Sequence, residues 1–397
     1  MGRPLPAVLG SIEFILRLTQ RTSKSAVEAK RPMTVLLCGD VMIGRGIDQV
    51  LPHPSAPVLY EAFAQSAGDY VRLAEQANGV IRKPVPFEYV WGDALGILTR
   101  ERADVRIVNL ETAVTRVDQP WPKGINYRMN PDNLPCLAVA NIDCCVLANN
   151  HVLDWGRKGL IETLDELGRA GLKTAGAGST DATAAAPAVL STTGKGRVLV
   201  YAVACASSGV PDDWAARRNR SGVNFVAKPS ATAVEAIAKQ IRGDRRPGDV
   251  IVLSVHWEAN WGYEIDSADR AFAHQLIDLA DVDVIYGHSS HHAKAIEVYR
   301  DKPILYGCGD LLNDYEGIET HKVFRGDLVL AYIGTFDSAN RHLIELKMAP
   351  FRIRNFRLNY AAAPEARWLQ HTMDRECRRF GGRVALGSDG LLSLSWQ

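Results

Sequence analysis

Three of the chain's 10 histidines lie within five positions, at 288, 291 and 292. The apolar run Val-Ile-Tyr precedes them and ends at Gly287, which is typical of a strand buried on both faces. We expect Gly287 to let the backbone turn sharply where this strand ends. Histidine is the commonest protein ligand for metal ions, and two rings on one loop can converge on a point. The spacing of His288 and His291 therefore predicts part of a metal site, with the other ligands at other strand ends.

Polar side chains follow four further apolar runs that we expect to be strands. They are Asp40 after Gly39, Asn109 and Glu111 after Val108, Asn149, Asn150 and His151 after Ala148, and His256 and Glu258 after Val255. Ligands bind beyond the carboxyl ends of the strands in open α/β sheets. Taken singly, Asp40 could cap a turn and His256 could be a buried histidine with a backbone partner. Taken together, these carboxylates, carboxamides and imidazoles suit two adjacent divalent cations that hold a substrate oxygen and activate a water.

The elements that would position these residues alternate in the first half of the chain and form hairpins in the second. Apolar runs indicate strands at 34–40, 104–111, 141–151, 197–206, 250–256, 282–287, 295–299, 303–306, 327–335, 342–346 and 351–360. Helical spacing indicates helices at 59–78, 159–170, 268–280 and 365–380, and the Ala/Gly/Thr-rich stretch at 174–188 is expected to be a loop. The pattern predicts an α/β fold with a mixed sheet, or two packed sheets, between helices.

Length and composition indicate a soluble globular protein. The 397 residues are 47% hydrophobic and 23% charged, and the formal net charge of +1 favours neither nucleic acid nor an anionic membrane as a partner. We expect a helical tether at 1–32, one catalytic domain at 33–360, and a C-terminal helix and tail at 361–397.

Two features bear on localisation. The seven cysteines are scattered without a CxxC pair, which favours a reducing compartment over a disulfide scaffold, and we expect Cys38, Cys144, Cys145 and Cys205 to be buried thiols. The apolar patches of the first 32 residues are interrupted by Glu13 and Arg17, and we expect neither a signal peptide nor a transmembrane segment. The sequence thus predicts a cytoplasmic protein, or one held at the membrane through a partner.

The motifs, in their order along the chain, resemble those of the CapA family of capsule and poly-γ-glutamate synthesis proteins. They are Cys38-Gly-Asp-Val-Met-Ile-Gly-Arg45, Asn109-Leu-Glu111, Ala148-Asn-Asn-His-Val-Leu-Asp154, Val255-His-Trp257 and Gly287-His-Ser-Ser-His-His292, and the likeness covers roughly residues 33–350. Two further stretches, His256–Tyr263 and Leu305–Asp310, look like an actinobacterial group of this family, the polyglutamine synthesis accessory proteins. The resemblance implies a calcineurin-like metallophosphatase fold, a sandwich of two mixed β-sheets flanked by helices.

The resemblance also implies roles for individual residues. Asp40 and His291 would ligate one divalent cation, Glu111 would bridge, and Asn150, His256 and His288 would ligate the second cation. His151 would be the catalytic acid or base, oriented by Asp154. The cations would be two, drawn from Mn, Zn, Fe, Mg or Ca. The chain departs from the wider superfamily at Met42, where a histidine is usual, and this disfavours ordinary phosphatase activity.

Four further residues could contact a substrate. Arg45 and Arg128 could bind an anionic group bidentately, and could equally be ion-pair partners within the protein. We also expect Asn109 to contact a substrate, and Trp257 to form part of an apolar wall, unless Trp257 is a core aromatic.

The function favoured by the sequence is metal-dependent action on a peptide-type polymer of the cell envelope, such as poly-glutamate. A polymer synthase is the expected protein partner. Three alternatives stay open: a peptide epimerase of a lasso-peptide-type pathway, in which His151 or His292 exchanges an α-proton; a metallophosphoesterase; and a non-enzymatic scaffold of a synthase complex.

Overall fold

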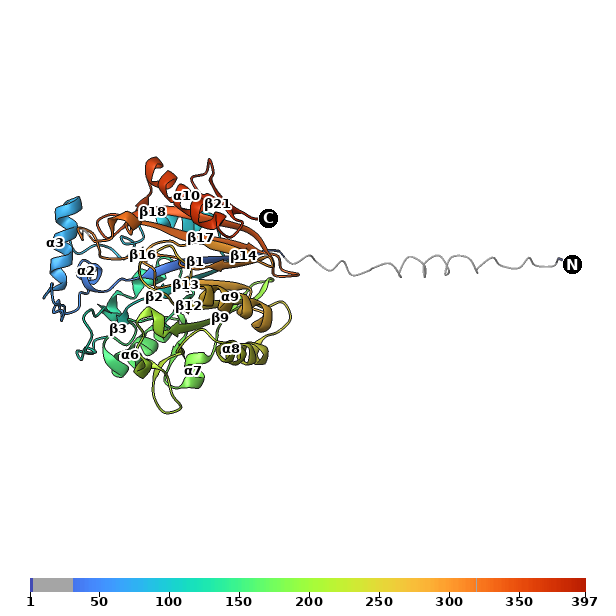
Figure 1. Cartoon of the computed structure of the whole chain (residues 1–397), viewed down its shortest axis with the longest axis horizontal. Coiled ribbons are helices and arrows are strands. Elements are labelled where there is room, and N and C mark those ends of the chain that lie inside the picture. Colours follow the sequence, from blue (N-terminus) through green and yellow to red (C-terminus); the bar gives the residue numbers. More distant parts are fainter. Residues whose placement is uncertain (3–30, 319) are drawn as a thin grey trace.

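Two mixed β-sheets lie against each other at the centre of the molecule, with helices on their outer sides (Figure 1). The structure, a computed structural model, describes residues 1–2, 31–318 and 320–397. The predicted helical tether at 1–32 falls almost entirely outside the described residues. The arrangement confirms the predicted fold class of two mixed sheets flanked by helices.

The larger sheet has 10 strands among the described residues, in the order β20-β21-β18-β17-β1-β2-β5-β6, with β16 beside β1 and β19 beside β18. Its parallel strands are β1 (Met33–Val41), β2 (Val105–Leu110), β5 (Cys144–Val146), β6 (Lys173–Ala175) and β16 (Asp310–Leu312). Its antiparallel strands are β17 (Leu328–Phe336), β18 (Leu343–Ile353), β19 (Leu358–Tyr360), β20 (Arg383–Leu386) and β21 (Leu392–Ser395). The carboxyl ends of the parallel strands meet at one edge.

The smaller sheet has seven strands in the described part of the chain, in the order β11-β9-β12-β13-β15-β14, with β8 beside β9. They are β8 (Ala188–Thr192), β9 (Gly196–Cys205), β11 (Phe225–Val226), β12 (Val250–His256), β13 (Val284–His288), β14 (Ile296–Tyr299) and β15 (Lys302–Leu305). β12 and β13 are parallel and in register, with His256 beside His288. Two separately predicted ligands therefore leave the sheet side by side.

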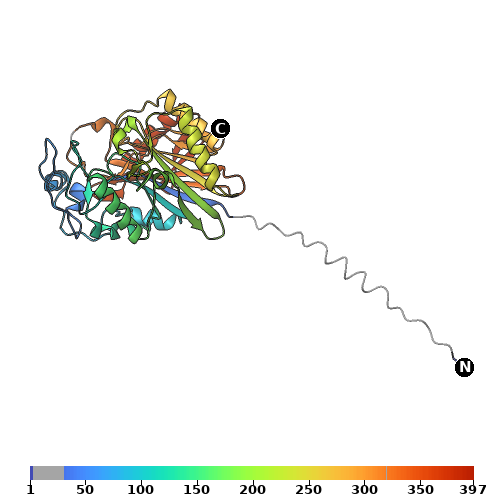
Figure 2. The ribbon, with the colours of Figure 1, turned by 90° about the horizontal axis from the view of Figure 1, so that it is seen from below.

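Both faces of the smaller sheet are buried, which explains why its central strands read as continuous apolar runs. Val252 of β12 belongs to the core between the two sheets. Ile251 and Leu253, on the other face, pack in a second core with α8 (Ala231–Asp244) and α9 (Ser267–Ala280). Figures 1 and 2 show these two helices on the outer side of this sheet, while α10 (Ala363–Arg378) lies beside the larger sheet.

The remaining helices and strands lie mostly in the connections and range from two to 14 residues in length. The helices are α2 (Arg45–Asp48), α3 (Ala67–Asn78), α4 (Ala94–Arg100), α5 (Pro135–Ala138), α6 (Gly156–Arg169) and α7 (Asp181–Ala185). Two small strand pairs lie outside the main sheets. β3 (Ala113–Val114) and β4 (Arg128–Met129) are parallel, and β7 (Ala177–Gly178) and β10 (Gly222–Val223) are antiparallel. No helix within the described ranges is both long and apolar enough to pass through a bilayer.

Several sequence-based expectations about local structure were wrong or incomplete. The stretch at 174–188 is not a loop, because it contains β7, α7 and the start of β8. The helix predicted at 59–78 begins only at Ala67, because the Ser66 side chain caps it by accepting from the Gly68 N–H. Helix α8 and strands β20 and β21 were not predicted. All seven cysteines are buried and free, including the four that were expected to be buried.

Candidate metal centre

Two Cys-Gly-Asp tripeptides, at 38–40 and 308–310, bring two carboxylates together at the carboxyl edge of β1. β1 and β16 pair in parallel with Asp40 beside Asp310, and the Asp40 N–H donates to the Gly309 carbonyl at 2.9 Å. A Cβ on Gly39 would lie 1.8 Å from that carbonyl oxygen, so the approach requires glycine. Both aspartates are 0% exposed. Strand pairing alone therefore fixes a buried carboxylate pair.

Asn109 connects the carboxylates of Asp40 and Glu111. Its side-chain amide donates to Asp40 Oδ1 at 2.8 Å and to Glu111 Oε2 at 2.9 Å, and its oxygen accepts from Asn149 at 3.0 Å. Burial, and then the charge of Asp40, hold the pKa of Glu111 well above its usual range. The sequence placed Asn109 against a substrate, whereas its amide here holds three other side chains.

Two groups of side chains have the geometry to hold a cation. The ligand atoms of Asp40, His291 and Asp310 lie within 4.8 Å of one another, and so do those of Asp40, Glu111 and His256. Asp40 is common to both groups. The resemblance implied that Glu111 bridges the two cations, whereas Glu111 belongs only to the group with Asp40 and His256.

Several buried ligand atoms have no hydrogen-bond partner among the described residues. They are Asp40 Oδ2, both ring nitrogens of His256, His288 Nε2 and Asn150 Oδ1. A buried polar group that lacks a partner costs about 1–3 kcal/mol, so such a cluster points to a missing ligand. Burial lowers the pKa of His256 to about 3, which keeps its nitrogens available to a metal. The donor set fits divalent cations that accept imidazole and carboxylate ligands.

Two histidines of the cluster each face a carboxylate. His288 Nδ1 lies 2.9 Å from Asp40 Oδ1, and His291 Nδ1 lies 2.8 Å from Asp310 Oδ1. Such a contact fixes the ring and directs the other nitrogen toward a metal.

The turn that releases these histidines differs from the predicted one. Gly287 lies inside β13, where a Cβ would come within 2.3 Å of the Tyr306 carbonyl oxygen. The sharp turn falls instead on Ser289, with a φ of 95°. Gly287 is thus required for close packing, and a strained serine makes the turn.

His151 is positioned as a base beside the second group. Its Nδ1 lies 2.6 Å from Asp154 Oδ2, and its Nε2 lies 3.9 Å from Glu111 Oε1. Burial and the Lys123 ammonium lower the pKa of His151 to about 4, against the opposing effect of Asp154. Lys123 Nζ also lies 2.8 Å from Asp154 Oδ1. Lys123 was not predicted, because nothing in its local sequence marks it.

His292 and Trp257 use their polar atoms within the fold. His292 Nδ1 lies 3.2 Å from the Ala293 carbonyl, and its Nε2 accepts from the Gly262 N–H at 3.1 Å. Trp257 is 0% exposed and donates from its indole N–H to the Tyr306 carbonyl at 2.8 Å. These contacts favour the core alternative for Trp257 and leave His292 with both ring nitrogens engaged.

Arg45 lies in a closed set of ion pairs and aromatic contacts. Its guanidinium contacts Asp314 at 3.1 and 2.5 Å and Glu61 at 2.9 Å. It also lies over the rings of Tyr70 and Tyr127, 3.8 and 4.2 Å from their centroids. These contacts favour the ion-pair alternative for Arg45.

Arg128 likewise has partners in the structure. It donates to the Val117 carbonyl at 3.0 Å and to Asp118 Oδ1 at 3.1 Å, and its guanidinium lies 3.8 Å from the centre of the Trp155 ring. Asp118 is largely exposed, so this pair sits closer to solvent than that of Arg45. The ion-pair alternative is again favoured.

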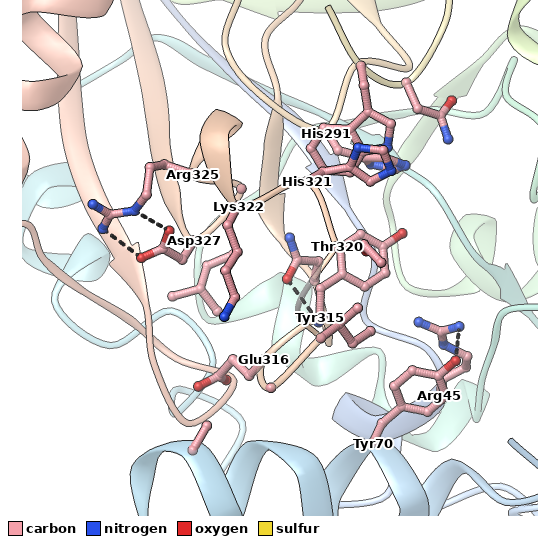
Figure 3. A pocket seen from close by; sticks show the side chains of 18 of the residues that line it. Arg45, Tyr70, His291, Tyr315, Glu316, Thr320, His321, Lys322, Arg325 and Asp327 are labelled. Atoms are coloured by element: carbon pink, nitrogen blue, oxygen red, sulfur yellow. Dashed lines mark hydrogen bonds and ion pairs between the residues drawn. The ribbon is translucent and has the colours of Figure 1, made fainter. Parts of the chain in front are cut away.

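A cavity of about 670 Å³ opens beside His291 (Figure 3). The Trp261 ring forms part of its wall, 5.4 Å from the centroid of His291 and stacked on His321 at 4.4 Å. Arg325 lines another side and is paired with Asp327 at 2.7 and 2.9 Å. The group that contains His291 therefore faces a space large enough for a peptide segment.

Known bacterial proteins are similar to this chain. The sequence model of the family described as bacterial capsule synthesis protein PGA_cap matches residues 34–315. The probable polyglutamine synthesis accessory protein of Mycobacterium tuberculosis is 48% identical over 366 residues, which cover 91% of this chain and 96% of that protein. The PGA biosynthesis protein CapA of Bacillus subtilis is 25% identical over 283 residues, covering 70% of this chain and 62% of that protein. A crystal structure of a novel phosphatase from Mycoplasma pneumoniae has 12% identity and a TM-score of 0.45, over 81% of this chain and 94% of that one.

Proposed function

The chain belongs to the bacterial capsule synthesis protein family PGA_cap, and from this we propose that it is a metal-dependent enzyme acting on a peptide-type polymer of the poly-glutamate kind. The observation that carries the proposal is the cluster of buried ligand atoms that lack partners in the described part of the chain. The substrate class comes from the names of its relatives, which refer to polyglutamine synthesis and to PGA biosynthesis.

The two ligand groups support a choice of metal-holding residues. Asp40, Glu111 and His256 would hold one divalent cation, and Asp40 and His291 would hold another. His288 and Asn150, each with a buried atom that lacks a partner among residues 31–318, would complete the set. Bound divalent cations supply Lewis-acid polarisation of a substrate oxygen and lower the pKa of a bound water.

His151 would transfer the proton. Its Nδ1 faces Asp154 at 2.6 Å, which places the proton of the neutral ring on Nδ1 and leaves Nε2 as an acceptor. Because burial and Lys123 lower the pKa of His151 to about 4, the ring is neutral at pH 7. A positioned general base of this kind contributes about 10²–10⁴-fold to a rate.

The cavity beside His291 would receive the polymer. Trp261 and Tyr315 give it flat surfaces for peptide groups and methylenes, and Arg325 and Lys322 add positive charge next to Asp327. Figure 3 shows His291 at one end of this space and Arg45 with Tyr70 at the other. A chain bound along it would present one peptide group to the His291 end.

Elemental analysis of the purified protein tests the metal centre first. We expect close to two divalent ions per chain, and loss of bound metal in Glu111→Ala and His288→Ala. Glu365→Ala and His342→Ala remove a carboxylate and an imidazole that belong to neither ligand group, and should keep both ions. A wild-type protein with no bound metal and no thermal shift on adding Mn²⁺ or Zn²⁺ contradicts the proposal.

Activity is tested next, on the metal-loaded protein with γ-linked glutamate oligomers and cell-wall peptides. His151→Gln should lower turnover about 10²–10⁴-fold while the metal content stays unchanged. Unaltered function in His151→Gln would instead favour the scaffold alternative.

Peptide epimerisation is the second candidate, and the neutral His151 ring beside the ligand groups is the observation that favours it. Because both ring nitrogens of His292 are engaged by backbone, exchange would depend on His151. Deuterium uptake at an α-carbon from heavy water, without cleavage, would identify this reaction.

A further inference from the structure

We propose that Asp310 is a direct ligand of the cation held by Asp40 and His291. The inference rests on the proposed metal centre and extends it, because none of the motifs that predicted the centre includes Asp310 as a ligand. It gives the cation position nearest the cavity a second carboxylate.

Strand pairing holds Asp310 at the required place. It lies beside Asp40 in the parallel register of β1 and β16, and its ligand atom falls within 4.8 Å of those of Asp40 and His291. A Cβ on Gly39 would meet the Gly309 carbonyl at 1.8 Å, so the absence of a side chain at Gly39 lets the two backbones approach this closely. The position of Asp310 is thus set by backbone packing.

The carboxylate of Asp310 keeps capacity for a metal despite its hydrogen bonds. Oδ1 lies 2.8 Å from His291 Nδ1, and Oδ2 accepts from the Asn313 side chain at 2.7 Å. Each carboxylate oxygen has two acceptor sites, so one remains on each. Beside it, Asp40 Oδ2 is fully buried and finds no hydrogen-bond partner in the described residues, which marks the side from which a ligand is missing.

The number of ligands also favours a further donor on this side. Asp40 and His291 alone give two protein ligands, whereas zinc sites in proteins use three or four. The residue two positions after Asp40 is Met42, which is buried and whose sulfur lies 3.7 Å from the Tyr315 hydroxyl. A thioether is a poor ligand for hard divalent cations, so Asp310 is the suitable neighbour.

Charge balance supports the same assignment. Asp40, Glu111 and Asp310 are buried together, and within the described ranges their ion-pair contacts are with histidines, not with lysine or arginine. Buried carboxylates without fixed cations are strongly unfavourable. Two divalent cations would offset the negative charge of all three carboxylates.

The alternative is that Asp310 only orients His291, as carboxylates commonly do for metal-bound imidazoles. Asp310→Asn separates the two roles, because asparagine keeps an oxygen that can accept from His291 but loses the charge of a metal ligand. Asn313→Ala is the matched control, since it removes the hydrogen bond to Oδ2 and leaves the carboxylate in place.

The experiment is dialysis of the full chain against Mn²⁺, followed by elemental analysis and electron paramagnetic resonance. Wild type and Asn313→Ala should hold two spin-coupled ions, and Asp310→Asn should lose at least one ion and the coupling. Two coupled ions in Asp310→Asn, with Mn²⁺ affinity within about threefold of wild type, would overturn the assignment, because the asparagine oxygen keeps the hydrogen bond to His291 and a purely orienting role needs only that bond.

Two further outcomes are kept distinct. Wild type without bound Mn²⁺ contradicts the proposed metal centre itself, before Asp310 is considered. If Asp310→Asn does not fold, Asp310→Glu keeps the charge and displaces the oxygens, and the affinity of one ion should then fall by more than about 100-fold, beyond the roughly 10–100-fold that displacing an orienting carboxylate costs. Unchanged affinity for both ions in Asp310→Glu would also count against a direct ligand.

Discussion

Buried carboxylates have different partners at the amino ends and at the carboxyl ends of the parallel strands. Where strands begin, Asp249 precedes β12 and Asp283 precedes β13, and both are buried. Asp283 pairs with Lys302 at 3.0 Å and with Arg245 at 3.3 Å. Asp249 pairs with an arginine in the same manner. This edge places fixed positive charge against each buried carboxylate.

Where the strands end, equally buried carboxylates face an amide and imidazoles, with no lysine or arginine paired to Asp40, Glu111 or Asp310 among the described residues. Asp40 contacts the Asn109 amide and a ring nitrogen of His288, and Glu111 lies 4.0 Å from a ring nitrogen of His256. Burial lowers the pKa of His256 to about 3, so this ring carries no charge at neutral pH. The first edge stabilises the fold by itself, and the second leaves carboxylate and imidazole ligands available for cations from solution.

The largest expected effect comes from breaking the fixed pairs. Asp283→Ala leaves lysine and arginine without their buried carboxylate and should lower the free energy of unfolding by about 3–5 kcal/mol. Urea unfolding at pH 7.5 in EDTA measures this, and bound metal should be unchanged when EDTA is omitted. Asp281 shares the same cations but has a side chain that is 55% exposed, so Asp281→Ala should cost under about 1 kcal/mol. Equal costs for the two variants would contradict the special role of the buried pair.

The next effect separates the edges directly. Glu111→Gln keeps the shape of the side chain and an acceptor for Asn109, and it removes a carboxylate that is repelled by Asp40. In EDTA the variant should be no less stable than wild type. Saturating Mn²⁺ at about 100 times its Kd should stabilise wild type by about 2.7 kcal/mol and leave the variant nearly unaffected. Thermal unfolding with and without Mn²⁺ gives both values, and a large loss in EDTA would mean that the two edges are alike.

The fold class and much of the candidate site could be predicted from the sequence, because the spacing of apolar residues and the polar residues that follow an apolar run are local signals. The polar residues after apolar runs gather as expected, with Asp40, Glu111 and His256 within one group. The alternation of side chains along a strand also explains why Trp257, next to His256, is in the core. That separation could have been predicted from the same pattern.

Other features depend on pairing between distant segments and were therefore missed. Asp310 meets Asp40 only because β16 pairs with β1, although the repeated Cys-Gly-Asp tripeptide was a signal within the sequence. Strand β21 forms by pairing with the distant strand β18, and β20 forms by pairing with β21. Helix α8 does not depend on distant pairing. The Ser230 cap and the helical spacing after it are local signals, so this helix could have been predicted from the sequence.

The smallest expected effect is a pH dependence that comes from a neutral buried histidine at the functional edge. Burial lowers the pKa of His292 from 6.5 to about 4 in the folded protein. Between these values the unfolded chain binds more protons than the folded one, so stability is full above about pH 6.5 and falls as the pH drops toward 4. At pH 5.5, one unit below the ordinary value, the loss from this ring should be ~1.4 kcal/mol.

His292→Gln tests this dependence, because glutamine offers an acceptor to the Gly262 N–H and does not titrate. The difference in unfolding free energy between pH 7.5 and 5.5, measured with urea in EDTA, should be smaller in the variant by that amount. Burial raises the pKa of Asp283 to about 6, which acts in the opposite direction over this range, but it is common to both proteins and cancels in the comparison. His342→Gln changes an exposed ring and should leave the wild-type difference intact. Equal pH dependence in His292→Gln and wild type would show that this imidazole is not held neutral by its burial.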